Sequence, residues 1–74
     1  MNTGETFRLG TPTLGIQIAG SHHETIMIPA GALIRIAGTC FQVDRLVDCL
    51  WDGHAVTLFA VDIRERGMRV LAAH

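Results

Sequence analysis

The sequence predicts an all-β protein, a small antiparallel barrel of five or six short strands with one helical or 3₁₀ turn before the last strand. Short segments alternate between apolar and polar residues with the two-residue period of half-buried strands. Glycine, proline and aspartate recur between these segments, where tight turns are expected. An Asp-Gly pair at positions 52 and 53 separates two such segments, which is typical of a type I′ hairpin.

Length and charge narrow the function classes. The chain has 74 residues, enough for one small core and too few for two. Basic and acidic residues nearly cancel to a formal charge of −1, so nucleic acid is not an expected partner. All six basic residues are arginine, and the chain has no lysine or tyrosine, which excludes Schiff-base chemistry and a tyrosine acid.

The cellular compartment and the expected cofactors can be inferred from apolar runs, the N-terminal residues and the cysteines. No apolar run approaches the ~20 residues that a bilayer span needs, so no membrane partner is expected. The N-terminal residues lack the basic start and apolar stretch of a secretory signal, which predicts a cytoplasmic protein. Cys40 and Cys49 fit that compartment as free thiols. No residue spacing indicates a cofactor.

The N-terminal part of the chain predicts little regular structure. Residues 1–12 are expected to form a loose arm, or one edge strand around Phe7, because glycines and polar residues surround a short apolar segment. The remaining residues, 13–74, are expected to form a single barrel domain.

The first strands of that domain are predicted by alternation and its interruptions. Residues 13–18 and 25–28 alternate with period two and are expected to pair as a hairpin across residues 20–23. Residues 29–31 contain proline and glycine, which interrupt sheet pairing, before residues 32–36 resume the extended pattern as a third strand.

The Asp52-Gly53 turn fixes the register of the next hairpin, because a two-residue loop places Trp51 opposite His54 and Leu46 opposite Phe59. One face, the better candidate for the core, then carries Val47, Cys49, Trp51, His54, Val56 and Leu58. The other face carries Leu46, Asp48, Leu50, Ala55, Thr57 and Phe59.

Residues 60–67 predict the single helical turn, with Asp62 as a cap and Gly67 as a glycine stop, and residues 68–72 predict the last strand. Across the whole chain the expected core is apolar and mostly β-branched. It comprises Ile16, Ile18, Ile26, Ile28, Ile34, Ile36, Val47, Cys49, Trp51, Val56, Leu58, Ile63 and Val70.

This order of elements resembles that of SH3-like small barrels, and the segment from Phe59 to Leu71, a helical turn followed by a strand, carries most of the resemblance. Residues 28–71 are also similar to short bacterial proteins of this barrel type. The resemblance implies a fold, and a shared fold does not confer a function.

One enzyme among small SH3-like barrels is the type B dihydrofolate reductase, whose tetramer holds its active site in a central pore. Its pore strand reads Val-Gln-Ile-Tyr-Pro, and the corresponding stretch here is Val56-Thr57-Leu58-Phe59-Ala60. The glutamine, the tyrosine and the proline are missing, and this chain has no lysine to match the pore lysine. The comparison therefore implies a common architecture without the reductase site.

Candidate chemistry is sparse. His22, His23 and His54 are the only candidate metal ligands, but adjacent residues on a strand point to opposite faces and no metal-binding spacing is present, so no metal is expected. Cys49 falls on the predicted core face, where a thiol ionises poorly, so a cysteine nucleophile is not expected either. No catalytic residue is predicted.

The sequence favours a non-enzymatic binding or assembly module that acts through its barrel surface. So small a core supplies little net stability, and the outward side chains of Leu46, Leu50 and Phe59 could be buried between copies. A homo-oligomer is therefore expected, with a different protein partner as the other occupant of this surface. The alternative is a small oligomeric enzyme or ligand-binding pore formed where subunits meet.

Overall fold

A computed structural model describes residues 2–38 and 45–71, and it confirms the all-β, antiparallel class with one helix before the last strand. Among the described residues there are seven strands rather than five or six. They are β1 (Thr6–Leu9), β2 (Thr13–Ala19), β3 (His22–Ile28), β4 (Leu33–Ile36), β5 (Leu46–Trp51), β6 (His54–Phe59) and β7 (Gly67–Val70), with helix α1 (Ala60–Arg66) between the last two.

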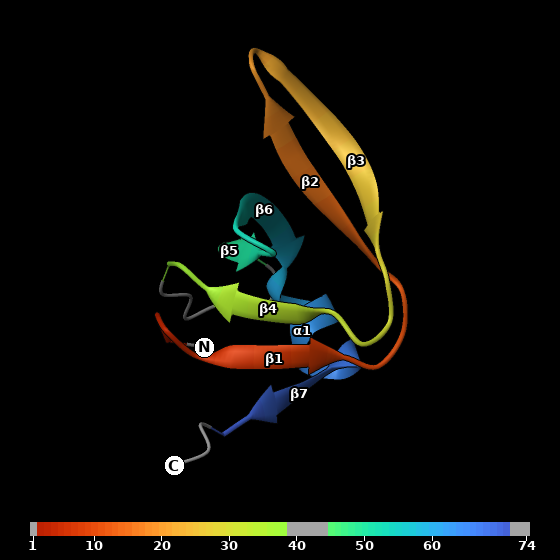
Figure 1. Ribbon diagram of the computed structural model, residues 1–74, viewed down its shortest axis with the longest axis vertical. Helices are drawn as coiled ribbons and strands as arrows, with labels where there is room; N and C mark the ends of the chain where they lie inside the picture. The colour runs from red at the N-terminus through yellow and green to blue at the C-terminus, as the bar shows by residue number, and fades with distance from the viewer. Residues whose placement is uncertain (1, 39–44, 72–74) are drawn as a thin grey trace.

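All seven strands belong to one sheet in the order β3-β2-β6-β5-β4-β1-β7. The sheet curls so that α1 lies against its β1, β4 and β7 half, while the β2-β3 hairpin projects away from the rest of the molecule (Figure 1). The molecule is accordingly elongated, with extents of 39 × 24 × 22 Å. β2 is registered with β6 only at Ile16↔Thr57 and Gln17↔Val56, so much of the hairpin extends beyond that contact.

The turn between β5 and β6 is the feature that the sequence predicts best. Asp52 and Gly53 both have positive φ, 51° and 78°, as a type I′ turn requires. Trp51 lies opposite His54 and Leu46 opposite Phe59, with every pair between them in the expected register. The faces predicted for this hairpin are therefore confirmed.

Replacing Gly53 with valine is expected to lower the free energy of unfolding by roughly 1–3 kcal/mol, because a β-branched residue is strained at positive φ. Urea denaturation followed by tryptophan fluorescence measures the change. Gly38→Val is a suitable comparison, because among residues 2–38 and 45–71 an added Cβ at position 38 would meet only the Asp48 side chain, at 3.8 Å. Equal stability of the Gly53 variant and the parent would contradict the turn assignment.

The core lies on the inner face of the curled sheet and beneath α1. Most of the predicted members are buried there, and Ile26 and Trp51 pack against them while remaining partly exposed. Val70, also predicted in the core, is only half-buried, because it shares the outer face with its partner Thr6. The buried hydrophobic residues are Leu9, Ile28, Ile34, Ile36, Val47, Cys49, Val56, Leu58, Ala60 and Ile63.

The prediction is wrong for β2. Ile18 is 62% exposed and Ile16 only half-buried, whereas Thr13 and Gly15 are buried. The reason is close packing against β3, since a Cβ on Gly15 would come within 2.9 Å of Ile28 Cδ1. Gly15 thus faces the core and the alternating isoleucines face outward.

The N-terminal residues are also more structured than expected. β1 is neither a loose arm nor an edge strand, because it pairs with β4 on one side and β7 on the other. Leu9 at its end is fully buried. The domain therefore includes residues before position 13, and the boundary predicted there is not a structural one.

Helix α1 begins directly after β6 and is anchored by two buried side chains, Ala60 and Ile63. Asp62 is not its cap, because no side chain caps the N-terminus, and Asp62 instead approaches Arg66 one turn later at 3.8 Å. Gly67 ends the helix in an extended conformation, φ −98°, and not in the left-handed conformation of a glycine stop.

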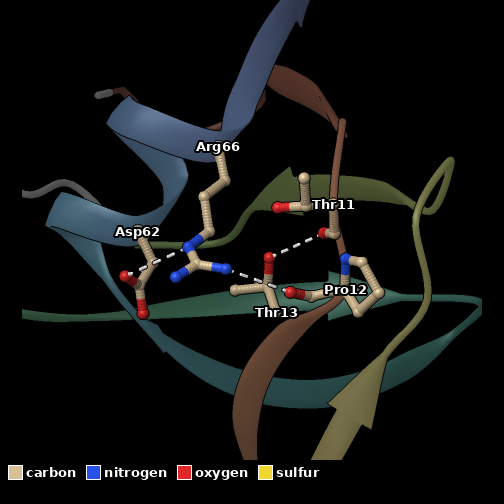
Figure 2. Close-up of polar contacts among 5 residues, drawn as sticks. All are labelled: Thr11, Pro12, Thr13, Asp62 and Arg66. Atoms are coloured by element: carbon tan, nitrogen blue, oxygen red, sulfur yellow. Dashed lines mark hydrogen bonds and ion pairs between the residues drawn. The ribbon is translucent and has the colours of Figure 1, made fainter.

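The end of α1 is tied to the start of the projecting hairpin (Figure 2). Arg66 Nη1 donates a hydrogen bond to the carbonyl oxygen of Pro12 at 3.2 Å, and the backbone N–H of Gly10 donates to the Arg66 carbonyl at 2.7 Å. The buried Thr13 hydroxyl donates to the Thr11 carbonyl at 3.0 Å. These contacts fix the point at which the hairpin leaves the body of the protein.

Candidate functional site

The candidate site is the outer face of the sheet, opposite the core. Cross-strand partners share a face, so the registers of the strand pairs assign each strand residue to one side of the sheet. All the large hydrophobic side chains that are exposed on described strands fall on the outer side. They are Leu14, Ile18, Met27, Leu33, Leu46, Leu50, Phe59 and Met68.

The three residues predicted to form an interface lie on this face. Leu46 is 50% exposed, Leu50 40% and Phe59 46%, while Val47 and Cys49 on the opposite side of β5 are almost fully buried. The structure thus places the predicted residues together on one exposed surface, and it adds apolar neighbours from β2 and β3 that the sequence reasoning assigned to the core or left out.

Four of these side chains form an apolar row across neighbouring strands. Met27 of β3 pairs with Leu14 of β2, and Phe59 of β6 pairs with Leu46 of β5. Extrapolated by two residues beyond the last registered pair, Ile16↔Thr57, the same register would bring Leu14 level with Phe59. With strands about 4.8 Å apart, the row is about 14 Å wide.

A hollow of about 260 Å³ lies beside this row. Ile16 and Ile18 of β2 form one wall, and Leu50 and Ala55 of β5 and β6 contribute the other. Asp48 also lines the hollow, and its Oδ1 lies 3.5 Å from the hydroxyl of Thr57. The hollow therefore combines apolar walls with one carboxylate, a lining that suits an apolar group carrying a hydrogen-bond donor or a positive charge.

A second hollow, about 410 Å³, lies between β1 and β7 and is lined by more polar groups. Glu5 and Arg69 form an ion pair there with a distance of 2.9 Å between Arg69 Nε and Glu5 Oε2. Arg69 is largely exposed, so the pair is screened by solvent and adds little to stability.

The histidines are not gathered into a centre. His22 and His23 are the first residues of β3 rather than part of a turn, and His54 begins β6. Strand β2 lies between β3 and β6 and separates the pair from His54. Within residues 2–38 and 45–71, no group of three or more histidine, cysteine, aspartate or glutamate side chains could hold a metal ion.

Cys49 is a free thiol on the core side of β5, as predicted. Its Sγ donates to the carbonyl oxygen of Val47 at 3.4 Å. Burial, and secondarily the negative charge of Asp48, raises the pKa of this thiol to about 12. Cys40, also predicted to be a free thiol, lies outside the described residues.

In a Cys40→Ser variant, Cys49 is expected to resist a thiol-specific reagent at about pH 8 while the protein is folded, and to react at once in denaturant. Because the folded state keeps a proton that the unfolded state releases, the free energy of unfolding should also fall as pH rises from 9.0 toward about 12. Absorbance of the released reagent measures the first effect. Rapid labelling of the folded protein would contradict the burial of this thiol.

No family model, curated protein or solved structure matches this sequence. The resemblance to SH3-like barrels therefore stays a prediction, although the antiparallel all-β architecture is confirmed. No helix within the described residues has the length and apolar character needed to cross a membrane.

Proposed function

We propose that this protein is a non-enzymatic assembly module of the cytoplasm, and that copies of it associate through the outer face around Leu46, Leu50 and Phe59. The observation that carries the proposal is the segregation of exposed apolar side chains, which all lie on the outer face of the described strands. The free thiol of Cys49 supports the compartment, since cytoplasmic proteins keep their cysteines reduced.

The area of this face supports an interface between copies. The folded chain exposes 5053 Å² in total. A standard interface buries roughly 800 Å² on each partner, and eight half-exposed large side chains offer an apolar area on the order of 700 Å². The face is thus of the right size for one stable contact, although it curves around the molecule and one flat partner could not cover it all.

Charge and stability favour a second copy of this chain as the occupant. The net charge of −1 means that two copies repel each other only weakly. A domain of this size rarely has more than about 3–5 kcal/mol of net stability from its own core. Complete burial of an exposed large apolar side chain contributes roughly 1.5–3 kcal/mol, and these half-exposed side chains gain about half of that between copies. Under a two-fold axis each residue contributes once from each copy.

Light scattering at about 100 μM tests the proposal, because association with a Kd near 1 μM is nearly complete at that concentration. The parent protein is expected to have a mass well above 8.0 kDa. The double variant Leu50→Glu, Phe59→Glu is expected to lose mass and to have a lower melting temperature. Arg64→Glu, on the exposed side of α1, changes the net charge equally and should leave the mass unchanged.

The parent protein should also melt at a higher temperature as its concentration rises, because dilution favours dissociation. An 8.0 kDa parent at 100 μM, with a melting temperature independent of concentration, would refute self-association. The outer face would then be the docking surface for a different protein.

The hollow beside the apolar row favours a second candidate, a ligand-binding cavity between subunits. A partner copy seated on the outer face would enclose the hollow and its single carboxylate, Asp48. Such a cavity suits a cation with an apolar body, and butylammonium is a simple probe. Calorimetric binding by the parent that is lost in Asp48→Asn would favour this candidate, and no heat of binding with either protein would count against it.

A further inference from the structure

The outer edge of β3 is one of the two edges of the seven-stranded sheet. β3 ends the strand order, and within the described residues only β2 pairs with it. With seven residues it is as long as any other strand, and it lies on the hairpin that projects from the body (Figure 1). Another chain could therefore approach this edge without meeting the rest of the molecule.

The direction of its backbone groups follows from the turn. Gly20, with φ 63°, and Ser21 form a two-residue loop, so the flanking pair Ala19 and His22 exchanges both hydrogen bonds. Alternate residues of β3 then bond to β2, beginning with His22. The N–H and C=O groups of His23, Thr25 and Met27 point to the free edge.

Glu24 is the one acidic residue of this edge strand, and most other features that protect edge strands from pairing are missing. β3 contains no proline and no lysine or arginine, and its seven pairs with β2 run without a bulge. The sheet's other terminal strand, β7, has only four residues and carries Arg69. Of the two edges of the sheet, the β3 edge is therefore the longer one and the one better suited to pairing with another strand.

We propose that β3 pairs antiparallel with β3 of a second copy, extending the sheet across a two-fold axis near Thr25. The inference rests on the proposed self-association and adds an edge contact to the face contact. An antiparallel pair of identical strands is self-complementary, so each copy supplies the backbone groups of His23, Thr25 and Met27. None of these three residues is acidic or an arginine, so the pairing brings no such charges together at these positions. With Thr25 at the axis, Glu24 lies opposite Ile26 of the partner and not opposite another glutamate.

The pairing would also join the outer faces of the two copies. His23, Thr25 and Met27 share the outer face with their β2 partners, so Met27 and Leu14 of both copies would belong to one continuous surface. Each copy would then have two two-fold contacts, one through the outer face and one through the β3 edge. Two different two-fold contacts produce an assembly larger than a dimer, as in many symmetric tetramers.

Amide hydrogen exchange on the full chain tests the edge contact directly. The amides of His23, Thr25 and Met27 are expected to exchange up to about fivefold more slowly at 500 μM than at 20 μM, because the unpaired fraction falls at most with the square root of the concentration. The amides of Glu24 and Ile26, which bond to β2, should be protected at both concentrations. Equal exchange of the three outward amides at both concentrations would overturn the proposal.

A pair of variants separates the edge from the face. Thr25→Pro removes an outward N–H without disturbing the bonds to β2, and Thr25→Val keeps the N–H with a side chain that suits a strand. By light scattering, Thr25→Pro should reduce the parent assembly to dimers and Thr25→Val should not. Circular dichroism must show that the Thr25→Pro variant is folded. If the variant is unfolded, amide exchange of the parent protein tests the edge contact instead.

Combining these substitutions distinguishes the two contacts. If both exist, Leu50→Glu, Phe59→Glu leaves edge dimers, and adding Thr25→Pro to it leaves monomers. If the edge contact fails while the proposed function holds, Thr25→Pro has the same mass as the parent. If only the edge contact exists, the Leu50→Glu, Phe59→Glu variant has the same mass as the parent.

Discussion

Gly67→Ala is expected to destabilise the protein by about 3 kcal/mol, at the upper end of what overpacking costs. The reason is the junction between α1 and β7. A Cβ at position 67 would lie 2.5 Å from the carbonyl oxygen of Ile63 and 3.4 Å from Phe7 Cβ, and the first of these atoms is backbone. The helix, or the strand that follows it, must move to admit even a methyl group.

Thermal denaturation measures this effect, with an expected fall in melting temperature of roughly 12 °C or more for a domain of this size. Gly38→Ala is the matched control, because a Cβ there meets the Asp48 side chain only at ordinary contact distance, 3.8 Å. It should change stability little. Similar melting temperatures for the two variants would show that the junction has room for a side chain.

Ile63→Ala is expected to lower the free energy of unfolding by roughly 2–5 kcal/mol, the range for truncating a buried isoleucine. Ile63 is fully buried and is the only large side chain that α1 contributes to the core. Without it, the helix keeps only Ala60 as a buried anchor, and a helix of seven residues does not persist without packing.

Urea denaturation of a graded series measures this loss. Ile63→Val should cost roughly 0.5–1.5 kcal/mol and remain folded even if the alanine variant does not. Arg64→Ala, at the next and exposed position of α1, should stay within about 0.5 kcal/mol of the parent. Equal effects at positions 63 and 64 would mean that α1 does not support the core.

The sequence predicts those features that are determined by residues close together in the chain. The Asp52-Gly53 turn carries its own conformational requirement, so the register of β5 and β6 and both of their faces follow from two residues. The outward positions of Leu46, Leu50 and Phe59 follow in turn. No distant part of the chain is needed for these conclusions.

The sequence prediction fails for β1 because its pairing partners are distant in sequence. It fails for β2 because a two-residue period does not show which face of a strand is buried. Alternation shows that Leu14, Ile16 and Ile18 share a face but not which face is buried. Here Gly15 takes the inner side because it allows close approach to Ile28. β1 was hard to predict because its partners β4 and β7 lie far along the chain and its four residues carry little pattern.

The pairing of β1 with β7 bears on when the protein can fold during synthesis. Thr6 lies opposite Val70 and Leu9 opposite Gly67, so the pairing joins residues about sixty positions apart. A ribosome adds residues one at a time, and the nascent chain can form the β2-β3 and β5-β6 hairpins early because each is closed by a two-residue loop. β1, however, has only β4 as a partner until β7 has emerged, and until then Leu9 cannot be fully enclosed. Folding of this domain is therefore expected to be completed only after β7 has left the ribosome.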